Sequence, residues 1–565
     1  MDIIEKESVE HGYIVGTSFG PMARLRVSCP HALHEILARN SAKFAKPQLA
    51  RTVLRPLLSS GLILSEGRVH STMAKLLKPI FTTQSLNSMR HRIARISLAH
   101  VLHMLRVTAC TEPKHALDLS KALSDLTLSI ICSVTMGTHM GPDLRPALQA
   151  SGVALTPAAH EVLPAQNHGS RAKAIVYNGI SVALDKLLSD SRWVLPLMIP
   201  NYVDRVPTPS NLQMRVNLKA MRELTRSIIA RKMELRKRPS ATQSADTVEP
   251  TWAAGGDMCD RMLDVLLGDD ASQQEKDVCT PQQMEAEVQT FVFAGHDTTS
   301  NLISWCMYCL GRHPQWHQRL RAELDTLLAQ HCVPEEQGGA APPPTDTAFT
   351  GLGLAQPSSA LIDVLATLGS DARTRAPVLE AVVRETTRFL PSVPRVVREP
   401  LQDVTINVPI TSLPKCDRKP DKYGRVPVTL PAGLTMLLDI SAVHRHPVWG
   451  SDRHAFNPGR FLDSEGKFHQ EHLPGLAWAP FAAGHRKCIG YNLALMEARI
   501  IVATLVLTAT FKTAAEYCHY PVMAVVTRPK FGMPMHVMPR SHLPLVRLAV
   551  GQEANTEAEA KTKQL

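Results

Sequence analysis

Cys488 is the residue whose surroundings point most directly to chemistry. It lies in a loop at 481–490 that is followed at once by an apolar helical stretch. At a helix N-terminus, unpaired backbone N–H groups and the positive end of the helix dipole favour a thiolate over a thiol. Gly484 and Gly490 permit close approach of the backbone to a flat group, and Arg486 adds positive charge beside an anion. The segment therefore predicts a bulky anionic disc with a soft metal at its centre.

The alternative for Cys488 is an ordinary buried cysteine, which most single cysteines are. Five matched positions at fixed spacing, Phe-x-x-Gly-x-Arg-x-Cys-x-Gly from Phe481 onward, argue against this alternative. The other cysteines indicate neither a zinc site nor a disulfide framework. Their total of 11 is odd, and the close pair Cys306 and Cys309 has no second pair to complete a zinc site.

A second group of polar residues interrupts an apolar helix that the periodicity predicts over 284–311. The segment 291–300 reads Phe-Val-Phe-Ala-Gly-His-Asp-Thr-Thr-Ser, and its Gly, Asp and three hydroxyl residues are poor helix formers. We expect a local loosening of the helix that turns a hydroxyl and a carboxylate into a cavity. The alternative is that the hydroxyls bond back to carbonyls one turn earlier.

The spacing around Cys488 resembles the haem-binding loop of the cytochrome P450 family, the haem-thiolate monooxygenases. The resemblance implies haem b as the cofactor, with Cys488 as the axial ligand of the iron, whose thiolate pushes electron density toward the metal. It also implies that Arg486 pairs with a haem propionate and that Phe481 packs over the thiolate. Gly484 and Gly490 complete the haem-binding loop in this interpretation.

The apolar helix at 284–311 is similar to the helix that crosses the distal face of the haem in this family. By this resemblance, Thr298 positions the oxygen bound at the iron and its water, and Asp297 helps to relay protons to it. Both are therefore catalytic residues by expectation. Family members that work without external electrons tend to lose this acid and alcohol, so their presence favours a monooxygenase.

Glu385 and Arg388 lie three residues apart, so they share one face of a predicted helix at 376–389 and can pair. Such pairs usually lie on solvated surfaces and contribute little to stability. In the P450 family, however, the Glu and Arg of this helix form a buried network with a downstream Arg, here Arg460. We expect this triad to be structural, with backbone carbonyls as further acceptors for the two arginines.

Two further residues resemble the family's contacts to the haem propionates. Arg398 follows the Glu-x-x-Arg helix, and we favour propionate binding over a solvated strand charge for it. His70 lies in a segment similar to the family's helix beside the haem, which carries a basic residue four positions later. That position is Ala74 here, and only the neighbouring Lys75 could substitute.

The remaining pattern predicts a mainly α protein with a small β-rich lobe, the cytochrome P450 fold. Apolar residues recur at helical spacing over 31–39, 121–136, 211–236, 284–311, 314–330, 376–389 and 491–508. Short strand-like stretches are predicted at 23–27, 404–408 and 435–440 and in a late run at 522–537.

The chain of 565 residues is 44% hydrophobic and 20% charged, which is a globular composition. We predict a short tail without an anchor at 1–12 and a single haem-thiolate monooxygenase domain at 13–545. Segments rich in Pro, Gly, Ser and Thr predict loop insertions near 238–257 and 333–357. The polar segment 551–565 is expected to be disordered.

The net charge of +11 favours acidic partners or membrane surfaces. With aromatic residues at 5% and no basic run interleaved with Tyr or Phe, nucleic-acid binding is not expected. The first residues carry acids where a signal peptide needs a basic and then apolar stretch, and no long apolar window is present. We therefore expect a cytoplasmic protein that contacts the cytoplasmic face of the endoplasmic reticulum peripherally.

The resemblance as a whole implies a monooxygenase of the eukaryotic microsomal type, with some similarity to fungal members. Such an enzyme inserts one oxygen atom from O2 into a small apolar organic substrate, and secondary metabolite biosynthesis is the expected setting. No flavin- or nicotinamide-binding fingerprint is visible, so electrons are expected from NADPH–cytochrome P450 reductase, with cytochrome b5 as a second donor. The alternatives are a reductase-independent haem-thiolate isomerase or dehydratase and a noncatalytic haem-binding protein.

Overall fold

The computed structural model describes residues 10–19, 22–109, 116–137, 205–237, 257–331, 359–413, 418–470, 473–514, 517, 519, 521–523 and 525–540. The predicted loop insertions near 238–257 and 333–357 fall outside these ranges, apart from residue 257. The predicted disordered tail at 551–565 and residues 1–9 of the predicted N-terminal tail also fall outside them.

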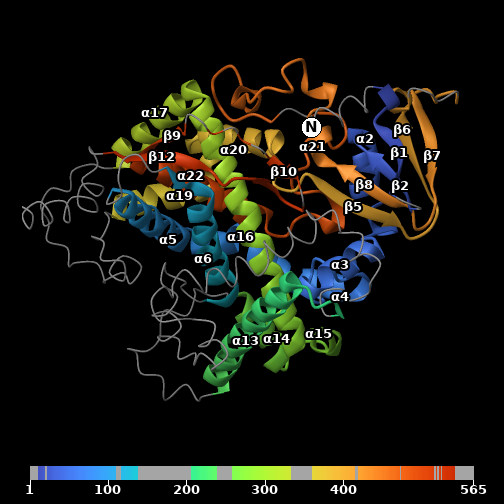
Figure 1. Ribbon diagram of the computed structural model, residues 1–565, viewed down its shortest axis with the longest axis horizontal. Helices are drawn as coiled ribbons and strands as arrows, with labels where there is room; N and C mark the ends of the chain where they lie inside the picture. The colour runs from blue at the N-terminus through green and yellow to red at the C-terminus, as the bar shows by residue number, and fades with distance from the viewer. Residues whose placement is uncertain are drawn as a thin grey trace, which may run out of the picture.

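A body of long helices surrounds α16 (Pro281–Arg312), which crosses the middle of the molecule (Figure 1). Its main neighbours are α6 (Leu119–Met136), α22 (Tyr491–Thr508) and α13 (Pro209–Lys237). The other long elements of this body are α3 (Gln48–Leu58), α4 (Gly67–Leu77), α5 (Thr83–Ala109), α14 (Met258–Leu267), α15 (Gln273–Val278), α17 (Pro314–His331), α19 (Ser359–Arg375) and α20 (Pro377–Phe389). The predicted mainly α fold is confirmed.

Helix α16 is buried over most of its length although many of its residues are polar, as expected for a helix in the core of a large domain. Thr280 caps its start by accepting a hydrogen bond from the N–H of Gln283, and Pro281 lies in the first turn, where its missing N–H costs nothing. Close packing on α6 depends on Gly295, because a Cβ there would lie 2.6 Å from Ile131.

The β-rich lobe lies beside the helical body and is built on a five-stranded sheet (Figure 1). The strand order is β1-β2-β8-β5-β3; β2 and β8 run parallel, and the other neighbours are antiparallel. Within this sheet, Phe44 pairs with Pro400 and Ala45 with Glu399. The five strands are β1 (Ile14–Phe19), β2 (Met22–Val27), β3 (Phe44–Ala45), β5 (Arg395–Pro400) and β8 (Thr435–Asp439).

Three smaller sheets occur in the described ranges. They are β6 (Val404–Pro409) with β7 (Arg425–Leu430), β10 (Pro521–Met523) with β11 (Thr527–Pro529), and β12 (Pro534–Pro539) between β4 (Leu117–Asp118) and β9 (Ala509–Thr513). The strands predicted at 23–27, 404–408 and 435–440 correspond to β2, β6 and β8. The late run at 522–537 is instead divided among three short strands that belong to two different sheets.

One predicted helix has a different form from the one expected. The segment 31–39 begins as a short α-helix, α2 (Pro30–His34), and continues as a π-helical turn, η1 (Glu35–Arg39). Pro30 lies in the first turn, and the thiol of Cys29 accepts a hydrogen bond from the N–H of Ala32 (3.5 Å). The wider turn at η1 brings its carbonyls against the Cys488 loop, as shown below.

Glu380 of α20 forms a buried ion network that joins this helix to α22. Its carboxylate contacts Arg384 one turn later (2.7 Å) and Arg499 of α22 (2.7 Å). Burial alone would raise the pKa of Glu380, but the guanidinium groups of Arg499 and Arg384 lower it to about 2. The Arg384 guanidinium also lies over the ring of Trp478, 4.8 Å from its centre. The network therefore holds the middle of α22 and the loop before this helix against α20.

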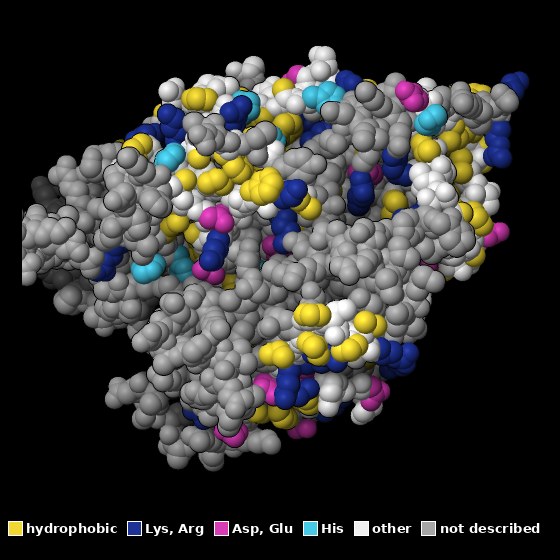
Figure 2. All heavy atoms as spheres, viewed as in Figure 1, with side chains coloured by type: hydrophobic (Ala, Val, Ile, Leu, Met, Phe, Trp, Pro, Cys, Tyr) yellow, Lys and Arg dark blue, Asp and Glu magenta, His cyan; other side chains and the backbone are white. Residues whose placement is uncertain are grey.

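Two helices of the described ranges, α6 and α22, are long and apolar enough to cross a membrane by length and composition, but most of each is buried inside the protein. They pack here as core helices. On the face shown in Figure 2, the described Lys and Arg side chains lie scattered among apolar and acidic ones.

Replacing Glu380 with glutamine leaves two buried guanidinium groups without their counter-charge. We therefore expect the free energy of unfolding to fall by about 3 kcal/mol at neutral pH, which is measured as a lower apparent Tm. The carboxyl's pKa of about 2 lies below its ordinary value of 4.5. Its contribution is therefore fully present above about pH 4.5 and is lost as the pH falls toward 2. The Tm difference between the wild type and Glu380→Gln should shrink over that window.

The control for this prediction is Glu465→Gln, because Glu465 forms an exposed pair with Lys467. We expect no measurable Tm change for the control at any pH. Equal Tm values for Glu380→Gln and the wild type at neutral pH would contradict the role given to the network.

Candidate active site

The Cys488 loop is closed by two backbone hydrogen bonds. The N–H of Cys488 donates to the carbonyl of Phe481 (3.0 Å), and the N–H of Lys487 donates to the carbonyl of Gly484 (3.1 Å). Because α22 begins at Tyr491, the cysteine lies next to a helix N-terminus. The Phe481 ring packs edge-on against Tyr491, with the ring centres 4.9 Å apart. The contact of Phe481 with a thiolate stays a prediction.

The sulfur of Cys488 is accessible and at the same time strongly desolvated. The residue is exposed, yet the surrounding protein raises the pKa of the thiol by desolvation, against the lowering effects of the Gly490 N–H and of Lys487. Such a group is recessed from bulk water. The helix N-terminus is therefore insufficient to produce a thiolate at neutral pH, and the predicted thiolate needs further positive charge, such as a metal ion.

The two glycines of this loop serve different purposes. Gly484 has a φ of +70°, and a Cβ there would lie 2.0 Å from the carbonyl oxygen of Leu37 in η1. Its missing side chain thus permits packing on η1, and the approach of its backbone to a flat group stays a prediction. At Gly490 a Cβ would meet no atom within 4 Å. The open space beside Cys488 is on that side.

Helix α16 presents one short accessible stripe. Between Ala286 and Leu310 it is buried except at Ala294, Gly295 and Thr298, which share one face by their spacing. The helix is unbroken here, so the predicted loosening is wrong. The Thr298 hydroxyl instead donates to the carbonyl of Ala294 one turn earlier (2.7 Å), as in the alternative considered for these hydroxyls.

Asp297 adjoins the stripe but is turned into the protein. It is 5% exposed, and its carboxylate accepts a hydrogen bond from the side-chain amide of Asn301 (3.1 Å). Burial raises the pKa of Asp297, while His296 and Asn301 act in the opposite direction. The carboxyl can therefore keep a proton at a higher pH than an exposed aspartate can. The hydroxyl of Ser392 donates to the Thr298 carbonyl (2.9 Å), which fastens α16 to the segment after α20.

A group of basic side chains lies beside the Cys488 loop and is called the cationic cluster below. Its members are Lys46, His70, Arg398 and Arg486. The guanidinium of Arg486 pairs with the carboxylate of Glu66 and donates to the carbonyl of Ser65 (2.7 Å). The structure therefore brings Arg398, Arg486 and His70 together, as the propionate interpretation requires.

Burial and mutual repulsion act on the members of this cluster. The pKa of Arg398 is lowered to about 10 by burial and then by Arg486. The pKa of His70 is lowered to about 3 by burial, then by Arg486 and His485, so His70 is neutral at physiological pH. Lys75, the predicted substitute for the base missing at Ala74, is exposed on α4 near Glu275, whose pKa is lowered mainly by hydrogen bonds with Ser272 and less by Lys75. It lies outside the cluster.

Glu385, Arg388 and Arg460 form a buried network in the arrangement expected for the structural triad. Arg388 makes two 2.7 Å hydrogen bonds to the carboxylate of Glu385, and Arg460 lies 3.4 Å from it. The predicted backbone acceptors are present: the two guanidinium groups also donate to the carbonyls of His444, Trp449, Asp452, Arg453 and Ala455. Because these donors have acceptors, the two guanidinium groups can be buried without a large cost in free energy.

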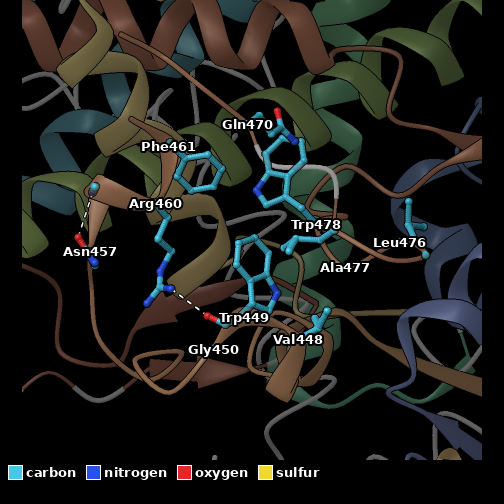
Figure 3. A pocket seen from close by; sticks show the side chains of 13 residues that line it. Val448, Trp449, Gly450, Asn457, Arg460, Phe461, Gln470, Leu476, Ala477 and Trp478 are labelled. Atoms are coloured by element: carbon cyan, nitrogen blue, oxygen red, sulfur yellow. Dashed lines mark hydrogen bonds between the residues drawn. The ribbon is translucent and has the colours of Figure 1, made fainter. Parts of the chain in front are cut away.

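A cavity of about 640 Å³ lies beside this triad (Figure 3). Its walls include Arg460, Phe461, Trp449 and Trp478, and Arg460 donates to the Trp449 carbonyl (3.0 Å). Its described lining residues lie between 448 and 478 and include neither Cys488 nor the stripe of α16. We therefore do not assign this cavity to the substrate.

Sequence reasoning did not single out Lys46, Glu66 or the Glu380 network. The i,i+4 spacing of Glu380 and Arg384 was a usable signal, since it places the pair on one helix face. No local spacing marks Lys46 or Glu66, because they meet the other cluster members only through the fold.

Comparison with known proteins shows which family this chain resembles. A family profile described as Cytochrome P450 matches residues 2–340 and 365–530. Cytochrome P450 CYP72A616 of Paris polyphylla is 24% identical over 527 residues, covering 93% of this chain and 81% of that protein. Cytochrome P450 monooxygenase sphH of Aspergillus fumigatus is 25% identical, covering 90% and 77%. A crystal structure of the cytochrome P450 CYP102L1 aligns with a TM-score of 0.64 at 19% identity, covering 95% and 97% of the two chains.

Because the family profile spans most of the chain, the protein belongs to the cytochrome P450 family. It has the P450 fold. It is accordingly a haem-thiolate monooxygenase, an oxidoreductase that uses haem b.

The described residues fit haem b on three separate grounds. Cys488 offers an accessible sulfur, and Gly490 leaves open space next to it. Thr298 lies on the accessible stripe of a helix that is otherwise buried. The cationic cluster, with Arg398 and Arg486, suits the propionate groups of the porphyrin.

Replacing Gly484 with alanine is expected to distort the Cys488 loop. The new Cβ would clash with the Leu37 carbonyl, and the backbone conformation at this position favours glycine. We therefore expect the free energy of unfolding to fall by about 2 kcal/mol. Haem content after purification and the apparent Tm should both fall. Gly16→Ala is the control, because no atom lies within 4 Å of its Cβ position. An unchanged Tm for Gly484→Ala would refute this explanation of the glycine.

Proposed function

We propose that this enzyme oxidises a small apolar organic molecule with electrons delivered by NADPH–cytochrome P450 reductase. The observation that carries the proposal is the accessible, recessed sulfur of Cys488 at the start of α22, within a loop of haem-binding spacing. Bound haem supplies the activation of O2 that protein side chains cannot perform.

We assign Cys488 the role of axial ligand. The N–H of Cys488 is held by the Phe481 carbonyl (3.0 Å), so the backbone of the loop is fixed around the sulfur. The Gly490 N–H and Lys487 favour the thiolate form. Arg398, Arg486 and His70 hold the propionate edge, and His70 does so as a neutral hydrogen-bond donor.

We assign proton delivery to Thr298 and Asp297. The Thr298 hydroxyl lies on the accessible stripe of α16, where it can position a water molecule. Asp297 precedes it, and burial raises the pKa of its carboxyl, which suits a group that takes up and releases protons. Retention of both residues favours a monooxygenase over a reductase-independent isomerase or dehydratase and over a noncatalytic haem protein.

The basic surface beside the Cys488 loop supports an acidic electron donor. Lys487 is exposed, with its ammonium 4.2 Å from the centre of the Tyr491 ring. The chain carries a net charge of +11. Complementary charge promotes docking of acidic partners, which suits the reductase and cytochrome b5 as a second donor. The same positive charge supports peripheral contact with the cytoplasmic face of the endoplasmic reticulum.

Secondary metabolite biosynthesis is the proposed setting. Its support is the similarity to Cytochrome P450 monooxygenase sphH and to Secologanin synthase 2 of Catharanthus roseus, which is 23% identical over 523 residues. Mass spectrometry of extracts incubated with the enzyme, reductase and NADPH tests this setting directly through the gain of one oxygen atom.

Replacing Cys488 with serine is expected to abolish the red-shifted absorption of the reduced carbon monoxide complex and to abolish turnover, because an alcohol does not provide a thiolate ligand. Cys29→Ser is the matched control. The Cys29 sulfur caps α2 by accepting the N–H of Ala32, and serine caps equally well. A Cys488→Ser enzyme that keeps both the absorption band and turnover would rule out the function proposed.

Replacing Thr298 with alanine is expected to separate NADPH consumption from oxygen insertion. Product formed per NADPH should fall at least about tenfold while NADPH oxidation continues and yields hydrogen peroxide, because the positioned proton donor is lost. Thr298→Ser keeps a hydroxyl and should keep most of the coupling. Equal coupling in Thr298→Ala and the wild type would remove this residue from proton delivery.

A further inference from the structure

Lys46 is a half-buried basic residue that nothing in the haem-binding motifs accounts for. It follows β3, and continuing the pairing of Ala45 with Glu399 places it opposite Arg398 of β5. Its N–H donates to the carboxylate of Glu66 (3.1 Å), and its ammonium donates to the carbonyl of Ile63. Like charges in directly opposed strand positions repel, so the arrangement is unfavourable on its own.

The pKa of Lys46 reflects these neighbouring groups. Burial, followed by the positive charges of Arg398 and Arg486, lowers the pKa of Lys46 to about 7, and Glu66 alone opposes them. An ammonium in this position is stabilised only when additional negative charge is nearby.

The cluster holds more positive than negative charge. When Lys46 is protonated, Lys46, Arg398 and Arg486 face the single carboxylate of Glu66, an excess of two charges, since His70 is neutral. Arg51 and Glu399 also act on this region, and their opposite charges leave the excess unchanged. Iron protoporphyrin IX carries two propionate groups, which would balance the excess.

We propose that Lys46 supplies the propionate-binding cation that α4 lacks at Ala74, and that Glu66 positions Lys46 and Arg486 for this contact. The inference rests on haem being the cofactor. The β3 segment thereby replaces a contact that the helix beside the haem would otherwise provide. Binding of the dianion removes the repulsion between Lys46 and Arg398, so cofactor binding and the packing of β3 on β5 stabilise each other.

The first test measures haem loss from the purified holoenzyme to excess apomyoglobin. Lys46→Met keeps the length of the side chain and removes its charge, and we expect haem transfer to become at least about tenfold faster. Lys43→Met is the control, because Lys43 is exposed three residues earlier in the same segment. Equal transfer rates for Lys46→Met and the wild type would overturn the proposal.

The second test separates propionate binding from a general weakening of the fold. Wild type and Lys46→Met are each reconstituted with iron protoporphyrin IX and with its dimethyl ester, which lacks the propionate charges. The wild type should lose the ester at least about tenfold faster than the free acid, and Lys46→Met should show a much smaller ratio. A ratio equal to that of the wild type would assign Lys46 a structural role only and overturn the proposal.

The double variant Lys46→Met with Ala74→Lys restores a cation on α4, and slower haem loss than in Lys46→Met alone would support the proposal. Should Lys46→Met not fold, Lys46→Arg keeps the charge, and its haem transfer must stay within about threefold of the wild type for the proposal to stand. A wild-type protein that binds no haem at all would instead contradict the proposed function.

Discussion

The desolvated sulfur of Cys488 is the feature on which the rest of the site depends. Burial raises the pKa of its thiol, and the helix N-terminus does not compensate for that effect. A stable thiolate therefore requires a metal cation beside it, and the loop must keep the sulfur accessible while excluding bulk water. Packing of Gly484 on η1 and the bond from Cys488 to the Phe481 carbonyl meet this requirement.

Helix α20 holds the Cys488 loop in place through two buried carboxylates, which join the helix to two different segments of the chain. Glu380 joins α20 to α22, and Glu385 joins it to the segment around Arg460. Each carboxylate is matched by more than one guanidinium, and the spare donors bond to carbonyls. Charge burial is tolerated because every group finds partners. The cationic cluster differs in that its positive charges outnumber its carboxylate, which is the expected state of a site that binds an anion.

Particular residues show how far prediction from the sequence reached. The Cys488 loop, the long helix with Thr298 and the pair Glu385 and Arg388 were readable because their residues lie at short, regular spacing, whereas Arg460 was assigned only through the family resemblance. The helix loosening at 291–300 was predicted wrongly, because the Thr298 hydroxyl bonds to the Ala294 carbonyl without breaking the helix. The packing of Gly484 on Leu37, a residue far away in the sequence, was not predicted.

The sequence by itself determined which residues do the chemistry, because a thiol before a helix, an acid next to an alcohol and a Glu-x-x-Arg pair are local patterns. Only the tertiary structure decided which charges surround them. Lys46 meets Arg398 through the pairing of β3 with β5, and Arg499 meets Glu380 through the packing of α22 on α20. These contacts join distant parts of the chain, and their energies depend on burial, which no local spacing encodes.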